Sequence, residues 1–147
     1  IASMRLSNAH AANIFLQNNV LMATDVTGFG LARHAQNLSL RLGIAGCVID
    51  LSSLPLLSGV TQLLAASITS SLHAQNRRAV KILNSDLADD MRFEALFDPQ
   101  TSGGLLGVFA QKDAENALQT LQQNNHQAAI IGWFDAQTNG IKIVSGR

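Results

Sequence analysis

One carboxylate, two hydroxyls and two glycines stand together in a short stretch of the chain, Thr24–Leu31, which reads Thr-Asp-Val-Thr-Gly-Phe-Gly-Leu. The short apolar run Val20–Ala23 precedes it and predicts a buried strand. A helix is expected to begin near Phe29, because apolar residues then recur at helical spacing. At such a strand-to-helix corner, called the first corner below, backbone N–H groups and the helix dipole can face an anion.

Asp25 at the first corner supports two interpretations. Its carboxylate, beside Gly28 and Gly30, can hold Mg²⁺, which proteins usually bind through one or two carboxylates while phosphate and water complete the shell. Alternatively, Asp25 caps the following helix or turns the chain. Spacing alone favours this second interpretation, because a Gly-x-Gly pair without further glycines is a weak motif. No Gly-x-x-x-x-Gly-Lys-Ser/Thr sequence occurs in the chain, which excludes an ordinary P-loop.

A second group of hydroxyls and glycines, called the second corner, lies in Asp98–Gly104 (Asp-Pro-Gln-Thr-Ser-Gly-Gly). It precedes the apolar run Leu105–Ala110, which predicts another strand. Adjacent glycines let a second backbone or a phosphate approach closely. A tight structural connection without a ligand explains the same residues equally well.

For the remaining reactive side chains, the local sequence pattern favours structural roles. His73, Arg77, Arg78 and Lys81 form a positive cluster, for which a solvated helix face is preferred over an anion site. The four histidines are scattered, and none has a zinc-ligand spacing to another His or Cys. The interpretations preferred on local pattern are a packed His34, a buried and inert Cys47 thiol and a core Trp133.

Bulk composition indicates one globular domain. A chain of 147 residues with 47% apolar content can fill a single core, and its ten basic residues balance ten acidic ones. This balance argues against nucleic acid or an anionic membrane as a partner. No apolar run reaches the roughly 18 residues of a membrane span, and Ile1–Arg5 does not begin a signal peptide. A single cysteine fits a cytoplasmic protein, and the opening suggests a fragment of a longer one.

Strands and helices alternate along the chain, which predicts an α+β fold, that is, an α/β sandwich with a mixed sheet layered by helices. Ser7 is expected to cap the first helix, and Asn139-Gly140 to turn the chain between the last two strands. The expected helices lie at 7–19, 29–38, 60–67, 73–83 and 112–124, and the expected strands at 20–23, 43–51, 92–97, 105–110, 127–134 and 140–144.

Taken together, the two corners resemble those of selenophosphate synthetase (selenide, water dikinase), in the C-terminal domain shared with the aminoimidazole ribonucleotide synthetase superfamily. The resemblance covers nearly the whole chain, so that residues 1–147 are expected to form a single C-terminal domain. It implies an ATP-dependent reaction in which selenide and water give selenophosphate, AMP and orthophosphate. Asp25 is then a Mg²⁺ ligand, and this assignment reverses the preference drawn from spacing. The cofactor-binding positions implied for Mg²⁺–ATP are Thr27, Gly28, Gly30, Thr101, Ser102 and Gly103.

The same resemblance implies that the chain holds half of a site. The family's reactive Cys or selenocysteine, its partner Lys and further metal aspartates belong to an N-terminal domain, and Cys47 does not match that position. No catalytic residue is therefore expected here, and the isolated chain is expected to be inactive. The implied partners are ATP, selenide and the N-terminal domain, and a homodimer stays open.

One segment departs from the family pattern. A glycine-rich approach to an Arg-Asn pair is expected in mid-domain, where this chain has Ser70–Arg78 (Ser-Ser-Leu-His-Ala-Gln-Asn-Arg-Arg). A ligand role for Asn76 or Arg77 is thus left open, as is a subgroup in which the synthetase is fused to another enzyme. Two alternative functions also stay open: another ATP-dependent synthetase or kinase of the superfamily, and a non-catalytic binding or regulatory module.

Overall fold

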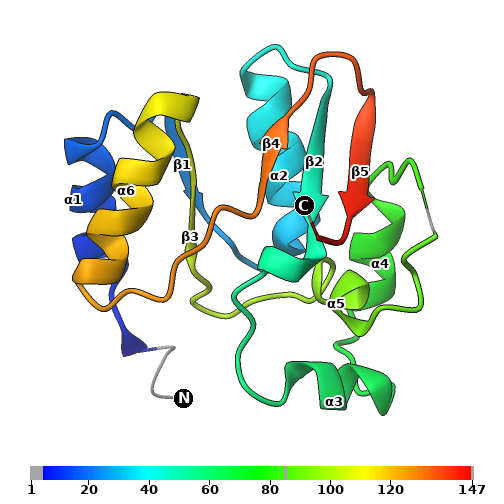
Figure 1. The fold of residues 1–147 in the computed structure, drawn as a ribbon. Helices are drawn as coiled ribbons and strands as arrows, with labels where there is room; N and C mark the ends of the chain where they lie inside the picture. The colour runs from blue at the N-terminus through cyan, green and yellow to red at the C-terminus, as the bar shows by residue number, and fades with distance from the viewer. Residues whose placement is uncertain (1–4, 85, 147) are drawn as a thin grey trace.

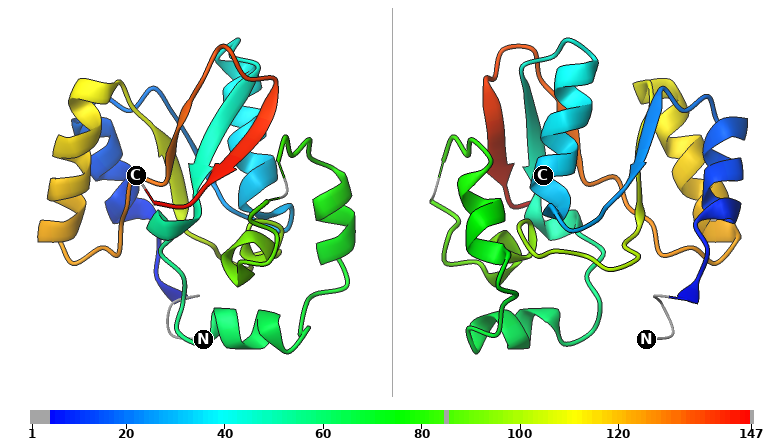
Figure 2. Two further views of the ribbon diagram at one scale, coloured as in Figure 1. Left: turned by 45° about the vertical axis from the view of Figure 1, so that its right-hand side comes forward. Right: turned by 180° about the vertical axis from the view of Figure 1, so that it is seen from behind.

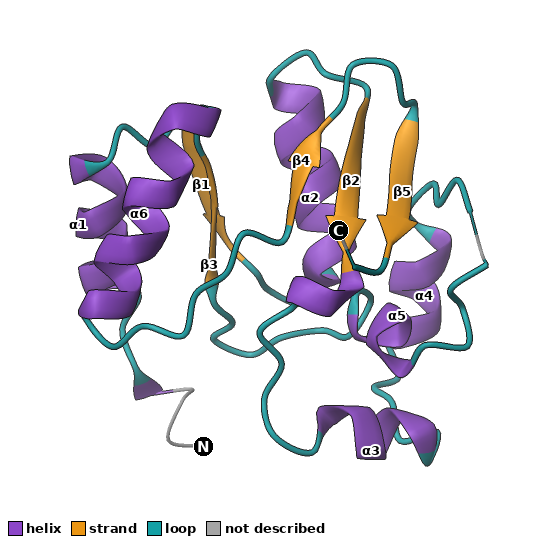
Figure 3. Cartoon of the chain, viewed as in Figure 1, coloured by secondary structure: helices purple, strands orange, loops and turns teal. Residues whose placement is uncertain are grey.

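The computed structural model describes residues 5–84 and 86–146 and divides into two lobes (Figure 1). The predicted α+β class is confirmed, with helices layered on two small sheets (Figure 3). Most of the opening segment 1–5, on which the signal-peptide interpretation rests, lies outside the described residues. In the described part of the chain, no helix is long and apolar enough to cross a membrane.

The smaller lobe consists of two helices packed on a two-stranded sheet. Helices α1 (Ala9–Gln17) and α6 (Gln111–Gln123) lie side by side against β1 (Met22–Asp25) and β3 (Leu105–Val108), as Figure 1 shows. The strands are antiparallel, with Asp25 opposite Leu105. The apolar side chains Ala11, Ile14, Phe15 and Leu121 form the core between them. The expected helices at 7–19 and 112–124 are thus confirmed, and the Ser7 hydroxyl accepts a hydrogen bond from the Ala9 N–H at 3.1 Å.

The larger lobe is built on a mixed three-stranded sheet in the order β4-β2-β5. Strand β2 (Gly46–Asp50) is buried along its whole length, and it pairs antiparallel with β4 (Gly132–Phe134) and parallel with β5 (Gly140–Val144). The last two strands therefore flank β2 and do not pair with each other. Helix α2 (Gly30–Arg41) covers one face of this sheet, which is clearest from behind (Figure 2). Because α2 also contacts β1 and β3, it joins the two lobes.

Three short helices complete this lobe. They are α3 (Val60–Ala65), α4 (His73–Arg78) and α5 (Met91–Ala95), and a 3-10 turn spans Leu51–Ser53. The helix predicted over 73–83 therefore ends at Arg78. The strand predicted over 127–134 is confined to β4.

The strand predicted for residues 92–97 is wrong, because the segment forms helix α5. Phe93, Leu96 and Phe97 are all buried, and their i, i+3, i+4 spacing places them on one side of a helical turn. The Asp90 side chain begins this helix by accepting a hydrogen bond from the Arg92 N–H at 2.9 Å. The alternating positions of Phe93 and Phe97 suggested a strand, but the segment is a helical turn that Asp90 caps.

Trp133 is not a core residue, since 40% of it is exposed. Its neighbour Phe134 packs against the central core, and successive side chains of a strand point to opposite faces. Trp133 therefore lies on the face of the sheet turned away from α2, opposite Val48 of β2. The prediction treated aromatic character as burial and ignored this alternation.

Candidate functional site

The first and second corners are far apart in sequence but adjacent in the structure. Antiparallel pairing of β1 with β3 ends at Asp25 and Leu105, and beyond it the Val26 N–H donates to the Gly104 carbonyl at 3.0 Å. The Gln100 N–H donates to the Thr27 carbonyl at 3.2 Å. The two predicted motifs thus form one continuous surface feature, in which each corner supports the other.

Gly103 makes this approach possible. A Cβ atom there would collide with the Val26 carbonyl oxygen and lie 2.9 Å from Gln100 Cβ. Ser102, just before it, has φ of 54°, a left-handed conformation that turns the chain toward the first corner. Thr101 and Ser102 themselves are exposed. The second corner is therefore packed against the first through its glycine and presents its hydroxyls to solvent.

Asp25 is exposed at the end of β1 and is held by an amide side chain. Asn8 Nδ2 donates to Asp25 Oδ1 at 2.8 Å and to the Gly103 carbonyl at 3.1 Å. A residue immediately before α1 therefore ties both corners together and fixes the carboxylate. Sequence reasoning missed Asn8, because nothing in its local pattern announces partners 17 and 95 positions away.

Asp25 does not cap the following helix. The N-cap position of α2 is Phe29, 63% exposed, and no side chain caps the helix by hydrogen bonding. The capping role is therefore wrong, while the alternative that Asp25 turns the chain stays a prediction. Its carboxylate is available at the surface as a cation ligand, although within residues 5–84 and 86–146 no three His, Cys, Asp or Glu side chains gather in a way that could hold a metal ion. One carboxylate alone fits Mg²⁺ only where phosphate, water or other protein groups complete the shell.

The start of α2 uses several of its N–H groups internally. The Gly30 N–H donates to the Thr27 carbonyl and the Ala32 N–H to the Leu96 carbonyl, both at 3.0 Å. Gly30 is buried with φ of 75°, and a Cβ atom there would lie 2.9 Å from the Leu96 oxygen. By contrast, a Cβ atom at Gly28 would meet nothing within 4 Å. Gly30 is therefore needed for close packing, whereas Gly28 borders open space.

His34 of α2 contacts Thr27 of the first corner from the buried side. The Thr27 N–H donates to His34 Nε2 at 3.1 Å, and the Thr27 hydroxyl lies at the same distance from that nitrogen. Because a backbone N–H can only donate, Nε2 must be the unprotonated nitrogen of the ring. Burial lowers the pKa of His34, and the negative charge of Asp25 opposes this shift. The prediction that His34 is packed is confirmed, and the ring positions Thr27.

These corners can be compared with those of known proteins. A family model described as the C-terminal domain of AIR synthase related proteins matches residues 3–144 of the chain. The chain belongs to this family. It is also similar to proteins named selenide, water dikinase: 34% identical over 130 residues to that of Geobacter metallireducens, 36% over 129 to that of Geobacter sp. strain M21, and 36% over 124 to that of Campylobacter jejuni.

The matches cover most of this chain but only a part of each relative. They span 88%, 88% and 84% of the chain, and 38%, 37% and 35% of the respective relatives. The chain therefore corresponds to little more than a third of the length of these curated proteins.

Within this AIR synthase-related domain, Asn76 connects the first corner to Ser70–Arg78, the segment that departs from the family pattern. Its side chain is 6% exposed, and Nδ2 donates to the carbonyls of Gly28 at 2.9 Å and Phe97 at 3.0 Å. Asn76 therefore fixes the backbone of the first corner from behind. A buried amide that donates to two backbone carbonyls has a structural role. The sequence could not predict this role, because both partners are distant along the chain.

The positive cluster predicted as a solvated helix face is only partly solvated. His73 is 8% exposed, and its Nε2 lies 3.2 Å from Glu94 Oε2 and 3.1 Å from the Glu94 carbonyl. Arg77 forms an ion pair with Glu94 Oε1 at 2.7 Å, and its guanidinium lies 5.4 Å from the centre of the Phe93 ring. The solvated interpretation is thus wrong for His73, while Arg78 and Lys81 are exposed as predicted.

Cys47 has no part in the site. It is buried in β2, and burial raises the pKa of its thiol to about 11. A thiol in this state is protonated and unreactive at neutral pH. The prediction of a buried, inert cysteine is confirmed.

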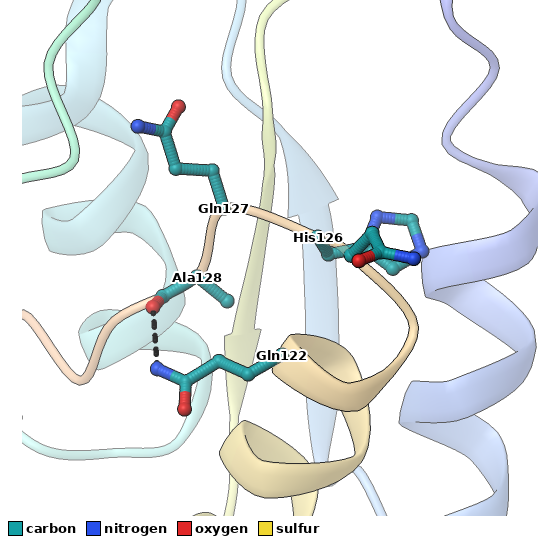
Figure 4. A pocket seen from close by; sticks show the side chains of 5 residues that line it. Gln122, His126, Gln127 and Ala128 are labelled. Atoms are coloured by element: carbon teal, nitrogen blue, oxygen red, sulfur yellow. Dashed lines mark hydrogen bonds between the residues drawn. The ribbon is translucent and has the colours of Figure 1, made fainter.

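Two hollows of the described surface lie away from both corners. One, of about 430 Å³, is lined by Gln122, Asn125, His126, Gln127 and Ala128 (Figure 4). The other, of about 260 Å³, is lined by Asp50, Ser52, Ser53, Ile130, Gly132 and Trp133. At the corners, the side chains of Asp25, Thr27, Thr101 and Ser102 are exposed on the surface of this chain.

Proposed function

We propose that this chain is the C-terminal domain of an ATP-dependent selenophosphate synthetase and that Asp25 is a ligand of the Mg²⁺ that accompanies ATP. The observation that carries the proposal is the Asp25 carboxylate, which Asn8 holds at the surface where the two corners meet. The names of the similar proteins support the choice of selenide as the phosphoryl acceptor. The full-length enzyme would convert ATP, selenide and water into selenophosphate, AMP and orthophosphate.

The residues of this chain have limited and separate tasks in that reaction. Asp25 would contribute one oxygen ligand, and Asn8 would hold the carboxylate in one orientation. Thr27, Gly28, Thr101, Ser102 and Gly103 would line the approach of the nucleotide, while Gly30 keeps the corner packed. Bound Mg²⁺ would neutralise phosphate charge, which is the main electrostatic demand of phosphoryl transfer.

The remainder of the site would come from the N-terminal domain of the same protein. A single carboxylate cannot complete a Mg²⁺ shell, and the matched relatives are much longer than this chain. The exposed side chains at the corners are consistent with a site that a second domain would complete. We place the reaction in the cytoplasm, where a single cysteine such as Cys47 stays reduced.

Substitution in the full-length enzyme tests the role of Asp25. Asp25→Asn keeps the size of the side chain but removes its charge, so selenide-dependent AMP formation should fall on the order of 10²-fold. Asn8→Ala leaves the charge but frees the carboxylate, and a smaller loss with an increased KM for Mg²⁺–ATP is expected. Asp89→Asn, at an exposed carboxylate outside both corners, is the matched control and should leave activity unchanged.

The outcomes separate the alternatives. Unchanged activity of Asp25→Asn would favour a non-catalytic binding or regulatory module. An intact enzyme that forms no AMP with selenide but phosphorylates another acceptor would identify a different synthetase or kinase of the superfamily. Either result would contradict the proposal.

A further inference from the structure

Two histidines from opposite ends of the chain meet on the surface of the smaller lobe. His126 Nε2 lies 3.0 Å from His10 Nδ1, and the two ring centres are 5.0 Å apart with the planes inclined by 44°. His10 belongs to the first turn of α1, and His126 follows the end of α6. Neither is buried, in contrast to His34 and His73.

The backbone on both sides of this pair is well supported. Helices α1 and α6 pack through a shared core that includes Ala11 and Leu121. After α6, Asn125 adopts a left-handed φ of 60°, and the His126 N–H then donates to the Leu121 carbonyl at 3.0 Å. This is the usual way in which a helix end is closed and the chain redirected. The two imidazoles are therefore brought together by packed elements and not by two loose loops.

The nitrogen separation matches that of two ligands on one metal ion. Two nitrogens that each lie about 2.0–2.1 Å from a metal and subtend roughly a right angle are about 2.9–3.0 Å apart. His10 Nδ1 and His126 Nε2 are already at this distance, and rotation of the two rings out of their present hydrogen bond would aim both lone pairs at one point. We propose that His10 and His126 form a two-histidine chelating site for a borderline transition-metal ion such as Ni²⁺, Cu²⁺ or Zn²⁺.

The surroundings leave room for the rest of a coordination shell. The hollow of about 430 Å³ adjoins His126 and is bordered by the side chains of Gln122, Asn125 and Gln127 (Figure 4). In the described part of the chain no third His, Cys, Asp or Glu joins the pair, so water and amide oxygens would occupy the other positions. Imidazole selects Ni²⁺, Cu²⁺ and Zn²⁺ over the hard ion Mg²⁺. The site is therefore chemically distinct from the one proposed at Asp25.

Titration of the tag-free chain with NiCl₂, and separately with CuCl₂, tests the proposal. Calorimetry should detect one equivalent of bound metal, and the thermal midpoint should rise as the metal concentration increases, since binding to the native state stabilises it. MgCl₂ at the same concentrations should produce neither effect at this pair. The variants His10→Asn and His126→Asn should each weaken binding at least tenfold, because each leaves a single imidazole. His34 and His73 stay in place in both variants as internal controls.

Each outcome decides the proposal. Loss of binding in both variants, with unchanged far-UV circular dichroism in the absence of metal, would support it. Equal binding by wild type and variants, or no binding by wild type, would overturn it and leave a simple imidazole–imidazole hydrogen bond. If His126→Asn disturbs the end of α6, Cu²⁺ broadening of the imidazole proton signals of the wild-type chain decides instead. Selective broadening of two of the four histidines supports the site, and any other pattern overturns it.

Discussion

Asp25 is oriented by the amide side chain of Asn8 and, among the described residues, not by a cationic side chain. Asn8 donates to one oxygen of the carboxylate and leaves its negative charge uncompensated. A Lys or Arg in the same place would neutralise that charge and compete with a cation. At the scale of single residues, the arrangement thus suits a carboxylate that binds a cation from solution.

His34 makes the stability of the first corner depend on pH. Burial lowers its folded pKa below the ordinary value of 6.5, so the unfolded chain binds the proton more readily. The contribution of His34 should be complete above about pH 6.5 and should decline as the pH falls below that value. Protonation at Nε2 would also oppose the Thr27 N–H, which donates to the same atom.

Urea unfolding of the chain at several pH values between about 8 and 5 measures this effect. His34→Gln is the matched variant, because its amide oxygen can still accept from Thr27 but does not titrate. The free energy of unfolding of the wild type should fall relative to that of the variant as the medium becomes acidic. Parallel curves for the two proteins would contradict the role assigned to His34.

At the scale of elements, the motifs were predictable and their environment was not. Both corners, the strands that flank them and the long helices were expected from local pattern. The contacts of Asn8 and Asn76 with the corners were not, since they join distant residues through single hydrogen bonds. Helix α5 was misjudged for a related reason. Phe93 and Phe97 satisfy the period of a strand and that of a helix, and the Asp90 cap decides between them.

Adjacent glycines in the second corner should respond very differently to substitution. In Gly103→Ala the new methyl group would collide with the Val26 carbonyl, so that β1 and the second corner must separate. A loss of about 1–3 kcal/mol in the free energy of unfolding is expected. In Gly104→Ala the methyl group meets nothing within 4 Å, and a change below about 0.5 kcal/mol is expected.

Denaturant titration of both variants by circular dichroism compares the two positions directly. Equal losses would show that the close approach of the corners does not limit stability. A larger loss at Gly104 would contradict the packing described for Gly103.

At the scale of the whole molecule, the two corners lie where the chain passes between the two lobes. The first corner joins β1 to α2 and the second joins α5 to β3, while the two hollows described above lie elsewhere. The N–H groups of Thr27, Gly30 and Ala32 already donate within the chain, so they cannot cradle phosphate without rearrangement. The anion-binding role first expected of the helix start is thereby reduced, and Asp25 becomes the main contribution that we propose for this chain.

The isolated chain should consequently bind Mg²⁺–ATP only weakly. One carboxylate and a few exposed hydroxyls give a dissociation constant in the millimolar range, equivalent to about −4 kcal/mol, and no turnover is expected. Calorimetric titration with Mg²⁺–ATP measures the affinity, and Asp25→Asn should weaken it further, whereas Asp89→Asn should not. Addition of the proposed N-terminal domain should increase the affinity by completing the metal shell. Micromolar affinity together with AMP formation by the chain alone would instead mean that the whole site is contained in these 147 residues.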